Sequence, residues 1–159
     1  MSRLTEVLSS SLISRVAKLE SDSEHEFFQY RLTSKASHGQ DVVKFGEKVV
    51  SSDDHGYDKS TGYFTARSDG LYLFYMQLKN ESSSKSLKAS IRQRKLVSDG
   101  AYTEKCRGFT NKEYLSVHCT TVLNLSAGDQ VYVQNHYAGS IINAGSTAQL
   151  SYFLGVKLN

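Results

Sequence analysis

Hydrophobic and polar residues alternate along most of the chain from Phe27 onward. A period of two is typical of β-strands with one buried face. The clearest case is 87–94, where Leu87, Ala89 and Ile91 alternate with polar residues. The other segments predicted to be strands are 28–32, 42–45, 49–50, 62–66, 70–78, 114–125, 130–137 and 148–158. About ten short strands separated by turn signals, without βαβ alternation, predict an all-β sandwich or barrel.

The first residues follow a helical period instead. An apolar stripe predicts an amphipathic helix over residues 1–20, formed by Leu4, Leu8, Leu12, Val16 and Leu19. The acidic and polar residues 21–26 predict a linker, and residues 27–159 a single β domain. A helix this short is marginal alone in water. We therefore expect its stripe to pack against a partner, and we favour the same helix of another subunit over the β domain.

Composition supports this division and excludes some classes of protein. Ten tyrosines and seven phenylalanines without tryptophan favour β structure. A net charge of +3 is too weak to indicate a nucleic-acid partner. No apolar run reaches the length of a membrane span, so membrane insertion is not expected. The first residues also lack the apolar core of a signal peptide, which leaves a cytosolic chain and a mature secreted chain as alternatives.

The two cysteines, Cys106 and Cys119, fit no metal-binding spacing. They would form a disulfide if they lie on adjacent strands, and two buried free thiols are an equal alternative. No metal site is predicted. The carboxylates of Asp53, Asp54 and Asp58 leave calcium as a minor alternative, although aspartate is also favoured in turns for its local hydrogen bonds.

Catalysis has no local signature. Five histidines and many serines are present, but no nucleophile elbow, phosphate loop or H-E-x-x-H motif accompanies them. We therefore expect a protein that is not an enzyme and needs no cofactor.

Polar and aromatic residues on the predicted strands and loops are candidates for ligand binding. The candidate residues are Arg92, Arg94, Tyr102, Arg107, Tyr132, Gln134, Asn135, His136 and Tyr137. Amides hydrogen-bond sugar hydroxyls, aromatic rings stack on sugars, and a guanidinium holds a carboxylate in bidentate geometry. The run 134–137 is the strongest candidate because binding residues favour loops on a rigid scaffold. The alternatives are solvated arginines on a polar strand face and a subunit interface at Tyr132.

Three motifs, in order, resemble those of the C1q globular-head family. They are Tyr57-Asp58 to Phe64-Thr65 with Gly70-Leu71-Tyr72-Leu73-Phe74, then Leu125 to Val131, then Ser151 to Leu158. The resemblance implies a ten-stranded jelly-roll sandwich preceded by a short N-terminal α-helix. It also implies a secreted or extracellular homo-oligomer, usually a trimer, with a helix-mediated dimer as the alternative.

With a helix in place of a collagen repeat, the chain resembles small invertebrate C1q-domain lectins. It implies a lectin that recognises glycans or glycoproteins on cells or microbes, sialic acid among them, in innate-immune or agglutinin-type recognition. The alternative is a secreted adhesion or signalling ligand that binds a protein receptor, since one fold hosts many functions.

Overall fold

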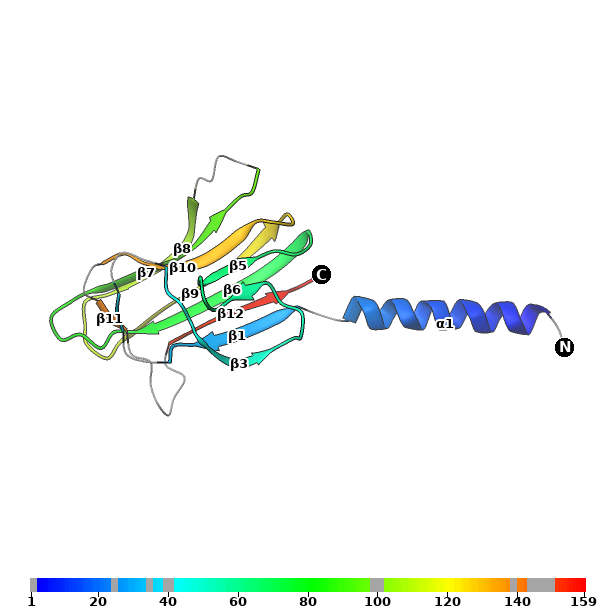
Figure 1. Cartoon of the computed structure of the whole chain (residues 1–159), viewed down its shortest axis with the longest axis horizontal. Helices are drawn as coiled ribbons and strands as arrows, with labels where there is room; N and C mark the ends of the chain where they lie inside the picture. Colours follow the sequence, from blue (N-terminus) through cyan, green and yellow to red (C-terminus); the bar gives the residue numbers. More distant parts are fainter. Residues whose placement is uncertain are drawn as a thin grey trace.

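The computed structural model describes residues 3–23, 26–33, 36–38, 42–97, 102–137, 140–142 and 151–159 (Figure 1). These described residues include one helix, α1 (Arg3–Ser23), which is followed by strands. The strands are β1 (Phe27–Arg31), β2 (Ala36–His38), β3 (Glu47–Ser51), β4 (Tyr57–Asp58), β5 (Tyr63–Thr65), β6 (Gly70–Lys79), β7 (Leu87–Arg94), β8 (Tyr102–Thr110), β9 (Ser116–Leu125), β10 (Gln130–Asn135), β11 (Ser140–Ile142) and β12 (Tyr152–Lys157).

Two five-stranded antiparallel sheets form the domain. One has the order β3-β1-β12-β6-β9 and the other β4-β5-β10-β7-β8, and a two-stranded sheet of β11 and β2 lies beside them. Neighbours in each sheet are mostly distant in sequence, as in β12 beside β1 and β10 beside β5. The predicted all-β jelly-roll sandwich with a short N-terminal helix is therefore confirmed.

Aromatic rings fill the space between the two sheets. Phe28 of β1 stacks on Tyr57 of β4 at 4.9 Å between ring centroids and meets the edge of Phe153 at 5.2 Å. Phe64 of β5 and Phe74 of β6 continue this layer with centroids 5.2 Å apart. All five side chains are buried. Rings from both sheets thus share one core, which favours the rigid scaffold that a surface site needs.

The helix α1 extends away from the sandwich (Figure 1). Its side chains from Glu6 to Val16 are exposed, and Leu8 and Leu12 are 62% and 63% accessible. The helix continues to Ser23, so it includes part of the segment expected to be a linker. No helix in the described part of the chain has the length and hydrophobicity needed to span a membrane.

Several strand predictions differ from the structure. Val43 and Phe45 are buried as expected, but only Val42 makes a β-bridge, so 42–45 supplies core side chains without forming a strand. The strands β2, β4, β8 and β11 were not predicted. The segment 148–150 of the final predicted strand lies outside the described residues.

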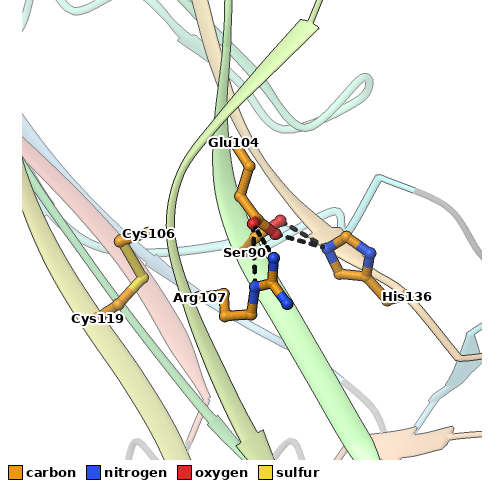
Figure 2. Close-up of a disulfide and its surroundings, with 6 residues drawn as sticks. All are labelled: Ser90, Glu104, Cys106, Arg107, Cys119 and His136. Carbon is orange, nitrogen blue, oxygen red and sulfur yellow. Dashed lines mark hydrogen bonds and ion pairs between the residues drawn. A yellow bond between two sulfur atoms is a disulfide. The ribbon is translucent and has the colours of Figure 1, made fainter.

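A disulfide joins Cys106 of β8 to Cys119 of β9, with Cα atoms 6.0 Å apart (Figure 2). These strands are end strands of different sheets, so the bond ties the two layers together at one side of the sandwich. Of the two alternatives left open by the sequence, the structure has the disulfide. Such a bond persists in oxidising compartments, which fits an extracellular protein.

Candidate functional site

The outward side chains of β10, β7 and β8 form a continuous surface that we call the polar face. The strand register sets them in rows across the sheet: Gln130, Arg94 and Tyr102 in one row, Tyr132, Arg92 and Glu104 in the next, and Gln134, Ser90 and Arg107 in the third. His136 continues β10 beside Lys88, whose carbonyl accepts its backbone N–H at 2.8 Å. The alternation predicted for 87–94 is confirmed, because Leu87, Ala89 and Ile91 are buried on the other side.

Aromatic residues cover one end of the polar face. The ring of Tyr132 lies 5.0 Å from that of Tyr63 and 5.3 Å from that of Tyr102, edge to face in the second case. Tyr132 is consequently 4% exposed, and this burial raises its pKa to about 12. Tyr132 therefore supports the rings around it, while Tyr102 is 38% exposed and able to meet a ligand.

Arg92 lies in the middle of the polar face and is hydrogen-bonded to both neighbouring strands. Its Nη1 donates to Gln134 Oε1, and its Nη2 to the carbonyl of Tyr102 at 3.5 Å. Its Nε is buried and has no hydrogen-bond partner among the described residues. The structure thus brings Arg92 and Gln134 into direct contact, as two members of the candidate set.

Ser90, Glu104, Arg107 and His136 form a second connected group (Figure 2). Ser90 Oγ lies 2.6 Å from His136 Nε2, and Glu104 Oε1 lies 3.5 Å from the same nitrogen. Arg107 donates to Glu104 Oε2 from Nε at 2.9 Å and from Nη2 at 2.6 Å. The group is a hydrogen-bonded network that holds the arginine and the histidine in place across β7, β8 and β10.

This geometry differs from that of a hydrolase triad. In a triad, one imidazole nitrogen meets the nucleophile and the other meets the carboxylate. Here Ser90 and Glu104 share one nitrogen of His136, and Ser90 is fully buried. The serine is therefore placed to orient the histidine rather than to attack a substrate.

The network also shifts the ionisation of its members. Partial burial lowers the pKa of His136, and the positive charge of Lys88 lowers it further, against the opposing effect of Glu104. Partial burial acts to raise the pKa of Glu104, but the hydrogen bond and charge of Arg107 outweigh it, and the pKa is lowered. At neutral pH the group therefore holds a neutral histidine beside an ionised glutamate and an arginine.

Arg94 lies at one end of the polar face, beside a surface hollow. Its guanidinium carbon is 5.5 Å from the centre of the Tyr102 ring, within the range of a cation–π contact. The hollow has a volume of about 370 Å³ and is lined by Thr65, Arg94, Leu96, Gly128 and Gln130. It combines a guanidinium, a hydroxyl, an amide and an apolar side chain, and no carboxylate lines it.

Tyr137 lies at the opposite end of the polar face, where a second hollow of about 340 Å³ is lined by Ser84, Lys85, Ser86 and Tyr137. The Lys88 ammonium is 6.0 Å from the centre of its ring. Asn135 points inward and is fully buried. Its Nδ2 donates to the Tyr137 carbonyl at 3.1 Å, so Asn135 shapes the loop that presents the tyrosine instead of lying on the surface.

The acidic turn considered for calcium is held by local contacts. Asp58 Oδ1 accepts hydrogen bonds from the N–H and the hydroxyl of Ser60, and Asp54 pairs with Arg67. In the described part of the chain, no three histidine, cysteine, aspartate or glutamate side chains are grouped as metal ligands would be. The Asp58 contacts are those of an ordinary Asx turn.

Ser90, Glu104, Lys88 and Phe109 belong to the polar face but were not among the candidates. The alternation over 87–94 places Ser90 and Lys88 on the polar side of their strand, but neither was predicted to bind a ligand or to support the site. Glu104 and Phe109 lie on β8, which was not predicted at all. Tyr102 and Glu104 are spaced by two, but a bulge in the β7–β8 pairing shifts the period, so Arg107 and Phe109 take the outward positions after it and the sequence shows no regular alternation.

Comparison with known proteins identifies the family and the fold. A family model described as "C1q domain" matches residues 27–156. The crystal structure of murine APRIL superposes with a TM-score of 0.67 at 17% identity, covering 85% of this chain and 100% of that one. The globular domain of zebrafish complement 1qA has a TM-score of 0.61 at 20% identity, covering 85% of this chain and 97% of that one. Eiger TNF from S. frugiperda has a TM-score of 0.67 at 16% identity, covering 85% of this chain and 92% of that one. The match over most of the β domain shows that the chain belongs to the C1q domain family.

Proposed function

We propose that this protein is a carbohydrate-binding lectin that recognises acidic glycans, sialylated ones included, through the polar face. The C1q-type fold supports a ligand-binding recognition domain, and C1q domains are commonly extracellular. The observation that carries the proposal is the row of Arg94, Gln130 and Thr65 around a hollow beside the Tyr102 ring. A guanidinium suits a sugar carboxylate, the amide and hydroxyl suit sugar hydroxyls, and an exposed ring suits stacking.

The charge of the polar face supports an acidic ligand. Arg92, Arg94 and Lys88 project from the same side of β7, while Glu104 is already paired with Arg107. An anion approaching this face therefore meets unneutralised positive charge. A neutral sugar would use the amides and rings but would leave the arginines unpaired.

We also propose that copies of the chain assemble, most simply as a trimer, through the outer face of the other sheet. We call this the apolar face. One of its rows across β1, β12, β6 and β9 is entirely apolar: Phe27, Val156, Leu73 and Val122. Phe27 and Val122 are 36% and 52% exposed. Exposed apolar side chains gathered on one sheet face favour a protein partner, and a second copy of the chain supplies a matching surface.

The exposed stripe of α1 extends this assembly. Leu8, Leu12 and Val16 remain accessible in the single chain, and the helices of neighbouring copies offer one another the apolar partner that the stripe lacks. Assembly also compensates for weak individual sites, because several polar faces on one particle bind a glycan-covered surface with avidity.

A glycan array tests the proposed function. The full-length protein is expected to bind a class of acidic glycans, and Arg94→Ala is expected to lose at least tenfold in signal. Lys48→Ala, which removes an exposed cation from the opposite sheet, is the matched control and should bind like the unaltered protein.

Absence of binding on the array, together with tight binding to a cell-surface protein, would contradict the lectin proposal. That result would favour the alternative, an adhesion or signalling ligand for a protein receptor. The structural likeness to murine APRIL and to Eiger TNF is a likeness of fold and chooses neither function.

A further inference from the structure

The polar face repeats one arrangement at both ends of β7. At one end the Arg94 guanidinium lies 5.5 Å from the centre of the Tyr102 ring, and at the other the Lys88 ammonium lies 6.0 Å from the centre of the Tyr137 ring. Residues 88 and 94 are an even number of positions apart, so both cations project from the same side of the strand. Six residues of strand separate them by about 20 Å.

Each end also has its own hollow with hydrogen-bonding groups. Thr65 and Gln130 line the hollow beside Arg94. Ser84, Lys85 and Ser86 line the hollow beside Tyr137. Phe109, which is 56% exposed, meets the Tyr137 ring edge to face with centroids 6.4 Å apart and widens the aromatic surface there. Both ends therefore offer a cation, a ring and a hydroxyl, which is the chemistry that suits an acidic sugar.

A polar track connects the two ends. Arg92 of β7 lies between them, flanked by Gln134 of β10 and Arg107 of β8, while Ser90 is fully buried and hydrogen-bonds His136. The carboxylate of Glu104 on this track is held by Arg107, so it leaves little uncompensated negative charge. A ligand that runs from one hollow to the other would find hydrogen-bonding groups and positive charge along the whole path.

We propose that the two ends form one extended site and that its ligand is a linear acidic oligosaccharide lying along β7, with acidic groups about 20 Å apart. This inference rests on the proposed function and adds to it the length and charge spacing of the glycan. A chain bound at one end engages the other end intramolecularly, at a high effective concentration. Affinity therefore rises with chain length until both ends are reached and stays level beyond that length.

Isothermal titration of the full-length protein against size-defined oligosaccharides tests this site. Two series are used at fixed salt, each from disaccharide to octasaccharide: oligogalacturonates, which carry carboxylates only, and heparin fragments, which also carry sulfates. In one series or both, chains that span the ends are expected to bind at least tenfold more tightly than the disaccharide. The series that shows the rise identifies the acidic group.

Variants at each end separate a spanning ligand from two independent sites. Lys88→Ala and Arg94→Ala are each expected to reduce the gain with length to less than threefold, and Lys48→Ala on the other sheet should preserve it. Equal melting temperatures confirm that the variants are folded. A protein that binds sugars on the array but has the same affinity for every length, or binds none of the acidic probes, overturns this inference alone. A protein that binds no sugar on the array overturns both this inference and the proposed function.

Discussion

Gly155 of β12 lies against the ring of Phe28, and no side chain fits between them. A Cβ atom at position 155 would come within 2.5 Å of Phe28 Cε1 and 2.9 Å of Phe74 Cε1. The glycine in the final strand thus allows two core rings to approach the backbone, which links the last motif of the sequence to the aromatic layer of the sandwich.

Gly155→Ala is therefore expected to destabilise the domain. Overpacking a filled core costs about 1–3 kcal/mol, because Phe28 and Phe74 must both leave their positions. Chemical denaturation measures this loss in the free energy of unfolding. Gly46→Ala is a matched control, since a Cβ there would meet only Thr33 Cγ2 at 3.6 Å and Oγ1 at 3.9 Å. Equal stability of the two variants would show that the rings accommodate the methyl group.

Loss of the disulfide is expected to lower stability as well. The bond closes a loop with a sequence separation of 13 residues, and a loop of that size corresponds to roughly 3 kcal/mol in the chain-entropy description. The double variant Cys106→Ser/Cys119→Ser should unfold at lower denaturant concentration than the oxidised protein. Reduction of the unaltered protein should reproduce the shift, and a midpoint that does not move would contradict it.

Binding of an acidic glycan is expected to strengthen as the pH falls below 6.5, the ordinary pKa of histidine. His136 is neutral at pH 7 because its pKa is lowered, and protonation adds a positive charge to a face that already holds Lys88, Arg92, Arg107 and the paired Glu104. One charge about 4 Å from an anion contributes about 1 kcal/mol in water, or about fivefold in affinity.

The variant His136→Gln should lose this pH dependence, whereas His55→Gln should keep it, because His55 contacts Tyr30 away from the polar face. Acidification has the opposite effect on the stability of the fold, which it lowers. Since the folded protein holds a proton on His136 less tightly than the unfolded chain does, the stabilisation is complete above pH 6.5 and is lost as the pH falls toward the lowered pKa. A titration in which affinity weakens on acidification would contradict the binding prediction.

Removal of residues 1–20 is expected to lower the mass of the assembly or to weaken it, as measured by light scattering across a dilution series. The double substitution Leu8→Glu/Leu12→Glu should act in the same direction, because both side chains are exposed on the stripe. Ser10→Glu adds a charge to the opposite side of the helix and should leave the mass unchanged. An unchanged mass after the deletion would refute the role of the helix.

The apolar face makes a separate prediction about assembly. Val122→Glu places a charge among the exposed apolar residues of β9 and is expected to shift the protein toward monomer in sedimentation velocity. Val97→Glu makes the same substitution at a 91% exposed position beyond β7 of the other sheet and is the charge-matched control. If both variants keep the mass of the unaltered protein, the subunits meet elsewhere.

Alternation predicted the strands that bury one full face. In β7 and β10 every second side chain is buried against the core, and the period is visible in the sequence. In β6 and β12 the burial also alternates, but apolar residues occupy both faces, so these strands were predicted from their apolar and aromatic content. The strand β8 was missed because it is an end strand whose described side chains, apart from Thr110, are not fully buried. Its polar residues therefore follow no hydrophobic period, and the bulge near Cys106 interrupts what alternation remains.

The candidate site was predictable as far as it follows strand geometry. Arg92, Arg94, Tyr132, Gln134 and His136 share one face because they are spaced by two on paired strands. Asn135 lies between two of these positions, so the same period turns it inward, and alternation excludes it from the face. The partners Glu104 and Ser90 required knowledge of which strands pair, and pairing between segments distant in sequence is set by the fold as a whole and not by local pattern.

The bond between Cys106 and Cys119 has a mechanical consequence. Under the proposed function, a glycan-covered particle bound on β7 and β8 would pull on the sheet that contains them, and the disulfide adds a covalent link between that sheet and the other. The disulfide would transmit this force to β9, and the hydrogen bonds between β9 and β6 would transmit it further into the other sheet. The force from a bound particle would thereby be shared by both sheets.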